Sequence, residues 1–165
     1  MRDVANVGDL ETFSRFVRLC AGRNGQLLNL SSLANDCGVI HTTSKRWISN
    51  LEASFILFLL RRHYENFSKR FIKSPKLYFL DTGLLNCLLR IRSTEDLRIH
   101  SQYGSIFESY IISELLKNYL NRAEEHPIHF WRNSIGNEID IIVNEGDSLL
   151  PLEIKAGQTV SSDFF

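Results

Sequence analysis

The sequence LNLSSLANDCGVIHTTSKRWISNLEAS, residues 28–54, predicts two short helices that meet at a tight turn. Ser31 or Ser32 is expected to cap the first helix, and Gly38 is expected to end it. Thr42 or Thr43 is expected to cap the second helix. Two short helices joined by a glycine turn are typical of a helix-turn-helix, in which the second helix is the recognition helix. Its buried face would hold Trp47, Ile48 and Leu51, and its outward face Thr42, Thr43, Lys45, Arg46, Ser49 and Asn50.

The flanking segments extend this pattern to a winged helix. A helix is expected from Asp9, with an end at Gly22, and strands are expected at residues 55–60 (FILFLL) and 76–80 (KLYFL). Between the two strands lies a basic segment with interleaved aromatic residues, a composition that suits contacts to phosphates. The alternative is that the module only packs against protein. The predicted DNA-binding residues are Thr42, Thr43, Lys45, Arg46, Arg61, Arg62, Lys69, Arg70 and Lys73.

The charges are divided unevenly along a chain of 165 residues whose formal net charge is zero. Residues 1–100 contain 15 Lys and Arg against 9 Asp and Glu, a balance of +6. Residues 101–165 contain 4 against 10, a balance of −6. This asymmetry predicts one part that meets a polyanion and another that concentrates carboxylates.

Composition excludes several classes of protein. The apolar run FILFLL ends at once in Arg61 and Arg62, far short of the roughly 20 residues that a membrane helix needs. The first ten residues lack the apolar core of a signal peptide. The three cysteines, Cys20, Cys37 and Cys87, form no C-x-x-C pair, which is typical of reduced thiols rather than of a disulfide or zinc framework. We therefore expect a cytoplasmic protein without membrane contact.

The second half of the chain predicts an α+β arrangement. After a short helix capped by Asp81 and a polar connector at residues 92–104, a long helix is expected at residues 105–120. Three hairpin-linked strands follow, at residues 127–133, 137–146 and 148–157. A helix followed by a three-stranded meander is thus the expected core of this half.

Three carboxylates and one lysine lie on this predicted frame. Asp140 is in the middle strand between two isoleucines, and Glu153 and Lys155 are two residues apart in the next strand, so they share a face. Glu108 lies on the preceding helix. Carboxylates in apolar strands must pair with cations, and Mg²⁺ or Mn²⁺ suits such ligands. Asp140 and Glu153, with Glu108, are the predicted metal ligands for phosphodiester hydrolysis, and Lys155 would position the water or stabilise developing charge.

Two further interpretations of these charges stay open. A Glu-x-Lys pair on a strand is commonly a surface salt bridge, and the whole set could be a buried ion-pair network that holds strand register. Gln158 follows the last strand and could reach a substrate.

Glu108, Asp140 and the EIK sequence of residues 153–155 resemble the PD-(D/E)XK pattern of restriction-endonuclease-like proteins. More of the chain is similar to the C-terminal region of prokaryotic AAA-type ATPases. The segments that resemble it are RDVANVGDLETFSRFVRLCAGRNGQLLNLSSLANDCGV, KSPKLYFLDTGLL, GSIFESYIISEL and FWRNSIGNEIDIIV with LEIKAG.

The resemblance implies a winged-helix domain at residues 1–95 and a nuclease-like domain at residues 96–165 that is incomplete at its carboxyl end. It also implies an upstream ATPase domain that would hold ATP, because this chain has no G-x-x-x-x-G-K-[ST] sequence. A sheet edge left open by truncation would invite pairing with a second copy. The expected function is DNA binding with Mg²⁺-dependent cleavage, and the alternative is a non-catalytic module that docks DNA or protein for the ATPase.

Overall fold

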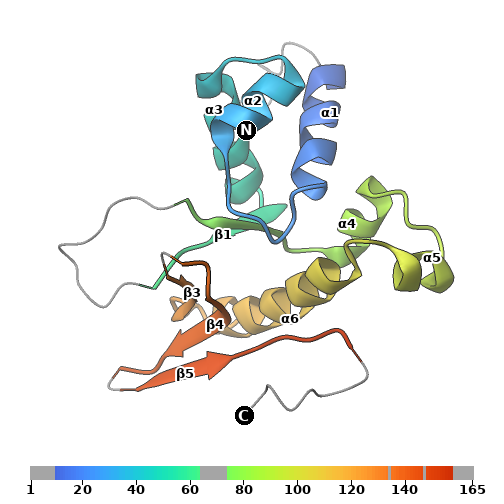
Figure 1. The fold of residues 1–165 in the computed structure, drawn as a ribbon. Helices are drawn as coiled ribbons and strands as arrows, with labels where there is room; N and C mark the ends of the chain where they lie inside the picture. The colour runs from blue at the N-terminus through green and yellow to red at the C-terminus, as the bar shows by residue number, and fades with distance from the viewer. Residues whose placement is uncertain (1–9, 64–73, 134, 147, 158–165) are drawn as a thin grey trace.

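The structure is a computed structural model that describes residues 10–63, 74–133, 135–146 and 148–157. It is a mixed α+β fold, as predicted, with helices and strands in alternating groups (Figure 1). The elements are α1 (Leu10–Ala21), α2 (Leu30–Cys37), α3 (His41–Ala53), β1 (Leu57–Leu60), β2 (Lys76–Phe79), α4 (Thr82–Leu88), α5 (Thr94–Ile99), α6 (Tyr103–Leu120), β3 (Ile128–Arg132), β4 (Glu138–Asn144) and β5 (Leu149–Leu152).

The helix pair α2–α3 forms as predicted, but both of its predicted caps are wrong. The side chain of Asn29, not Ser31 or Ser32, accepts from the N–H of Ser32 and caps α2. Gly38 ends this helix at a φ of 76°, a conformation that glycine adopts without a steric cost. Helix α3 begins at His41, before Thr42, and has no side-chain cap.

Strands β1 and β2 form the middle layer of the molecule, with α1–α3 on one side and α6 on the other (Figure 1). They pair antiparallel, Leu57 opposite Phe79, and their side chains alternate between two cores. Leu57 and Phe79 pack with the α1–α3 core, whereas Phe58 and Tyr78 pack with α6, β3 and β4. Both faces of the β1–β2 pair are therefore buried, one in each of the two cores.

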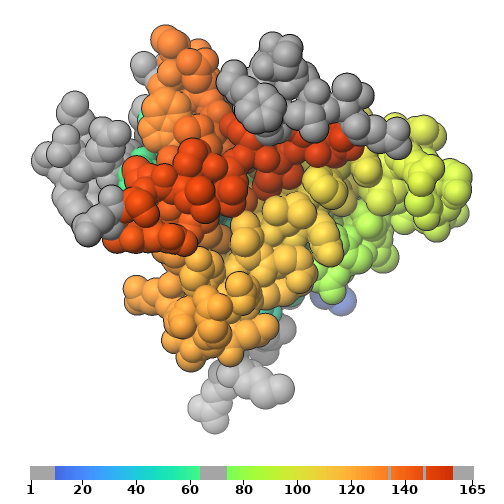
Figure 2. Space-filling model, turned by 90° about the horizontal axis from the view of Figure 1, so that it is seen from below, coloured from blue at the N-terminus to red at the C-terminus, as the bar shows by residue number. Residues whose placement is uncertain are grey.

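The second sheet has the predicted meander order β3–β4–β5, with antiparallel neighbours. It is joined to the segment just after β1, because the N–H of Phe130 donates to the Arg61 carbonyl at 3.1 Å and the Phe130 carbonyl accepts from the N–H of His63 at 2.7 Å. Seen from below, α6 and the β4–β5 strands form most of the described surface of this face (Figure 2).

Strand β5 is shorter than predicted. It ends at Leu152, before Glu153 and Lys155. The N–H of Ile154 donates to the Asp140 carboxylate at 2.8 Å, so a side chain takes the hydrogen bond that would continue the ladder. This competition between a side chain and the backbone is a tertiary contact that strand periodicity does not contain.

Residues 94–99 form a helix, α5, where we predicted a polar connector. Ser93 caps it by accepting from the N–H of Asp96 at 3.0 Å. Acidic residues lie in its first turn and Arg98 in its last, which suits the helix dipole. No residue of α5 is buried, so the helix has no apolar stripe that would predict it from sequence. In the part of the chain that the structure describes, no helix has the length and apolar character needed to span a bilayer.

Candidate functional site

Helix α3 presents a polar and basic face to solvent. Thr42, Lys45, Arg46 and Ser49 are exposed, as predicted, whereas Thr43 and Asn50 are half-buried. On the opposite face, Trp47 packs against α1. Its ring lies edge-on to those of Phe13 and Phe16, with ring centroids 5.3 and 5.1 Å apart. The aromatic contacts fix the rotation of α3 and thereby aim its basic side chains outward.

The other predicted DNA-binding residues differ in placement. Arg61 is exposed just after β1. Arg62 is half-buried, and its guanidinium donates to the carbonyl of Arg132. Lys69, Arg70 and Lys73 lie outside the described residues, as does Gln158.

A cluster of charged groups lies between β2, α6 and β4. The ammonium Nζ of Lys76 is 3.2 Å from Oε1 of Glu108 and 2.5 Å from Oε1 of Glu138. The hydroxyl of Tyr78 donates to the same Oε1 of Glu108. Arg132 approaches the second oxygen of Glu138 at 3.4 Å. We call Lys76, Tyr78, Glu108 and Glu138 the Lys76 cluster.

Burial and charge shift the pKa values in this cluster. Burial alone would lower the pKa of Lys76, but Glu108 and Glu138 outweigh it and raise that pKa. Burial raises the pKa of Glu108, while Lys76 and the Tyr78 hydroxyl lower it and the negative charge of Asp140 raises it further. Burial also raises the pKa of Tyr78, and the charge of Glu108 adds to the effect. A charged lysine among carboxylates is therefore the stable state of the cluster.

The predicted metal ligands do not converge on one point in this arrangement. Glu108 is paired with Lys76, and Asp140 lies close enough to raise the pKa of Glu108 while accepting from Ile154. Glu153 and Lys155 are exposed beyond β5 and pair with each other at 3.2 Å. Within the described ranges, no group of three or more His, Cys, Asp or Glu side chains could hold a metal ion. The residues as arranged do not fit Mg²⁺, because the Lys76 ammonium lies against Glu108 while Asp140 accepts from Ile154 and Glu153 pairs with Lys155, and we derive no step through a metal.

Lys76, Tyr78 and Glu138 of this cluster were not expected as site residues from the sequence. Lys76 opens the apolar strand 76–80, and it is only 4% exposed. A lysine that begins a fully buried strand requires a carboxylate partner, and that signal could have been used. The partners themselves come from α6 and β4, far along the chain, so spacing could not identify them.

The loop between α1 and α2 packs against the start of α6, next to Glu108 of the Lys76 cluster. Gly25 has a φ of 78°, and a Cβ placed there would lie 3.2 Å from Cβ of Ser105 and 3.5 Å from Oε2 of Glu108. The buried Asn24 donates to the Ser105 carbonyl at 3.0 Å and accepts from the N–H of Phe79 at 3.1 Å. These contacts hold the first turns of α6 against β2.

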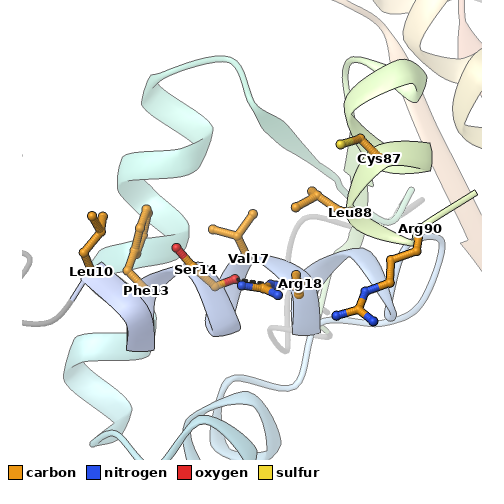
Figure 3. Close-up of a pocket in the computed structure, with 8 residues that line it drawn as sticks. All are labelled: Leu10, Phe13, Ser14, Val17, Arg18, Cys87, Leu88 and Arg90. Carbon is orange, nitrogen blue, oxygen red and sulfur yellow. Dashed lines mark hydrogen bonds between the residues drawn. The ribbon is translucent and has the colours of Figure 1, made fainter.

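A shallow groove of about 450 Å³ separates α1 from α4 (Figure 3). Phe13, Val17 and Leu88 line it with apolar surface, while Arg18 and Arg90 line it with charge. The groove lies on α1 and α4, away from the residues predicted to act on DNA or metal.

Comparison with known proteins gives two family matches. Residues 1–95 match the family described as "Domain of unknown function (DUF8612)". Residues 103–165 match "Domain of unknown function (DUF4143)", a domain found in the C-terminal region of AAA-type ATPases.

Two relatives resemble nearly the whole chain. They are uncharacterized proteins of Mycobacterium bovis and Mycobacterium tuberculosis, each 29% identical over 163 residues. The match covers 97% of this chain but 36% of each relative, so the chain spans about a third of their length. No solved structure matches the chain.

Proposed function

We propose that this chain is a DNA-docking accessory region of an AAA-type ATPase. The chain belongs to the family "Domain of unknown function (DUF8612)", because the match covers residues 1–95, more than half of its length. Its second part matches a domain that occurs in the C-terminal region of such ATPases, which supports the link. In this proposal the chain binds DNA and does not cleave it.

The observation that carries the proposal is the outward face of α3. Four of the side chains predicted to face outward, two of them cationic, are exposed on a helix whose other face packs through Trp47 against α1. A rigid helix with exposed Lys, Arg, Thr and Ser suits contact with phosphates and base edges in the major groove. Arg61 adds an exposed cation just after β1.

The order of elements also favours a winged helix. Helix α1 is followed by a short segment in which Leu27 pairs with Lys76 of β2, then by α2, α3, β1 and β2. The segment at Leu27 therefore lies beside β2, and β2 lies beside β1. The basic residues 64–73 connect β1 and β2 in the sequence.

Hydrolysis of DNA with Mg²⁺ receives less support from the geometry. The three carboxylates proposed for it form no group in the described residues that could hold a metal ion, and Glu153 pairs with Lys155. Glu108 is already paired with Lys76, Asp140 accepts from the N–H of Ile154, and Glu153 and Lys155 are exposed. We therefore assign the carboxylates a structural role and the α3 face the functional one.

Binding to duplex DNA at several salt concentrations tests this function. Lys45→Ala combined with Arg46→Ala should weaken binding and reduce the slope of log K against log salt by about 2, because each lost phosphate contact removes about 0.9 from the slope. The control combines Arg92→Ala with Arg98→Ala, which removes the same charge from another exposed surface. Equal affinity and slope for the Lys45/Arg46 variant and the unaltered chain would refute the assignment.

A further inference from the structure

The groove between α1 and α4 combines apolar and cationic surface. Phe13 and Val17 of α1 and Leu88 of α4 are half-buried, so each packs on the core with one side and lines the groove with the other. Leu10, at the start of α1, is 73% exposed, and Arg18 lies in the last turn of the same helix. The groove therefore runs along α1 from an apolar end to a cationic end (Figure 3).

Both arginines of the groove are open to a partner. Arg18 and Arg90 are exposed, and neither forms an ion pair with the residues that the structure describes. Nε of Arg18 reaches the carbonyl of Ser14 at 3.4 Å, which is long for a hydrogen bond. A guanidinium can hold a carboxylate through two parallel hydrogen bonds, so two unpaired arginines beside apolar surface indicate a partner that carries carboxylates.

The backbone at Arg90 supports a role in binding. Arg90 has a φ of 62°, in the left-handed region where glycine has no steric cost, and its N–H donates to the Cys87 carbonyl at 3.1 Å as α4 ends. A glycine would suit this helix end better, whereas the arginine adds a cation to the groove. Non-glycine residues in this conformation occur preferentially at functional sites.

We infer that the α1–α4 groove is a docking site for an acidic amphipathic helix, which would place its apolar side chains on the apolar surface of the groove and its carboxylates on Arg18 and Arg90. From Leu10 to Arg18, α1 rises by roughly 12 Å, the length of about two helical turns. A partner helix of this length presents apolar side chains three and four positions apart on one face. Nucleic acid fits less well, because phosphates would leave the apolar surface uncovered. The inference does not depend on DNA binding.

Cys87 is an internal probe of the groove. It lines the groove and is exposed, whereas Cys20 and Cys37 are buried. Burial also raises the pKa of the Cys20 thiol, which slows its reaction. Iodoacetamide should therefore label Cys87 first, and a helix bound in the groove should slow this labelling.

The test uses a fluorescent peptide of about 15 residues made of leucine, alanine and glutamate, with leucine at every third or fourth position. In a matched peptide, lysine replaces glutamate. Fluorescence anisotropy measures binding to the chain, and the rate of Cys87 alkylation measures occupancy of the groove. The acidic peptide should bind and slow the alkylation several-fold, whereas the lysine peptide should do neither.

Variants of the two arginines test the charge contacts. Arg18→Gln combined with Arg90→Gln should weaken binding of the acidic peptide about tenfold, because two exposed ion pairs are lost. Arg18→Glu combined with Arg90→Glu should reverse the preference, so that the lysine peptide binds better. The control, Lys45→Gln combined with Arg46→Gln, removes the same charge from the α3 face and should bind the acidic peptide as the unaltered chain does.

Four results would overturn the inference. The first is equal binding, or no binding, of the two peptides, and the second is binding of the acidic peptide that leaves the alkylation of Cys87 unchanged. Duplex DNA that slows this alkylation by itself would make the groove a nucleic-acid surface. Cys87 that resists iodoacetamide in the chain alone would show that the chain itself or a second copy already fills the groove.

Discussion

Tyr78 is a phenol in the shared strand layer, and its hydroxyl donates to Glu108 inside the core. Burial and the adjacent negative charge both favour the neutral phenol, so they raise its pKa above the ordinary 10.0. The folded state therefore keeps a proton that the unfolded chain releases at alkaline pH. The stabilisation is fully present below pH 10.0, declines as the pH rises above that value, and is lost only as the pH passes the higher pKa of the folded state.

We expect the free energy of unfolding to fall above pH 10.0, with Tyr78 contributing about 1.4 kcal/mol per pH unit. Tyr78→Phe should make this decline shallower, whereas Tyr110→Phe, which alters an exposed tyrosine, should not. Denaturant unfolding at a series of pH values measures the slopes. Equal slopes for all three proteins would contradict the placement of Tyr78.

Single residues were predictable where a local signal sufficed. Asp81 caps α4, as predicted, and accepts from the N–H of Leu84 at 3.0 Å. The closeness of Glu108 and Asp140 also follows from the expected order of helix and strands. Lys76 could not be placed beside them, because its contact with Glu108 joins two parts of the chain that local patterns treat separately.

Most helices and strands with a marked run of apolar residues were predicted from the sequence, whereas α5 and the end of β5 were not. Helix α6 forms where a long helix was expected, and its buried face consists of Ile106, Ile112 and Leu116 together with Ser109 and Ser113. Helix α5 buries no residue, so only its cap and charges mark it. The end of β5 depends on a hydrogen bond from the N–H of Ile154 to the Asp140 carboxylate, and the spacing of apolar residues in the sequence does not predict this contact.

The end of α3 contains a residue in an unfavourable backbone conformation. Phe55 has a φ of 56°, the left-handed region that glycine and asparagine tolerate best, and it is 69% exposed. The N–H of Ile56 returns to the carbonyl of Leu51 at 3.0 Å, so the helix end requires this conformation. Because the ring packs little, the backbone cost is not offset by burial.

Phe55→Asn should therefore stabilise the chain by roughly 0.5 kcal/mol, because asparagine adopts the left-handed conformation at a lower cost. Phe55→Val should destabilise it, since a β-branched side chain suits this conformation worst. Denaturant midpoints compare the two variants with the unaltered chain. An asparagine variant that is less stable than the valine variant would show that the ring, and not the backbone, determines stability here.

At the scale of the molecule, the two cores share β1 and β2, and the Lys76 cluster closes the contact between the two family-matched parts. The zero net charge of the sequence conceals this division of roles. The basic part exposes cations on α3 and contributes one buried lysine to the acidic part. Lys76 thereby pairs with Glu108 and Glu138 within the fold, and the α3 face remains the surface we assign to DNA.

The most direct test of this account incubates the chain with labelled duplex DNA and either Mg²⁺ or Mn²⁺, and follows binding and cleavage in the same samples. We predict that the DNA is bound and remains intact, and that Asp140→Asn and Lys155→Ala leave binding unchanged. Metal-dependent cleavage that is lost in both variants would contradict the account and establish Glu108, Asp140, Glu153 and Lys155 as a nuclease site.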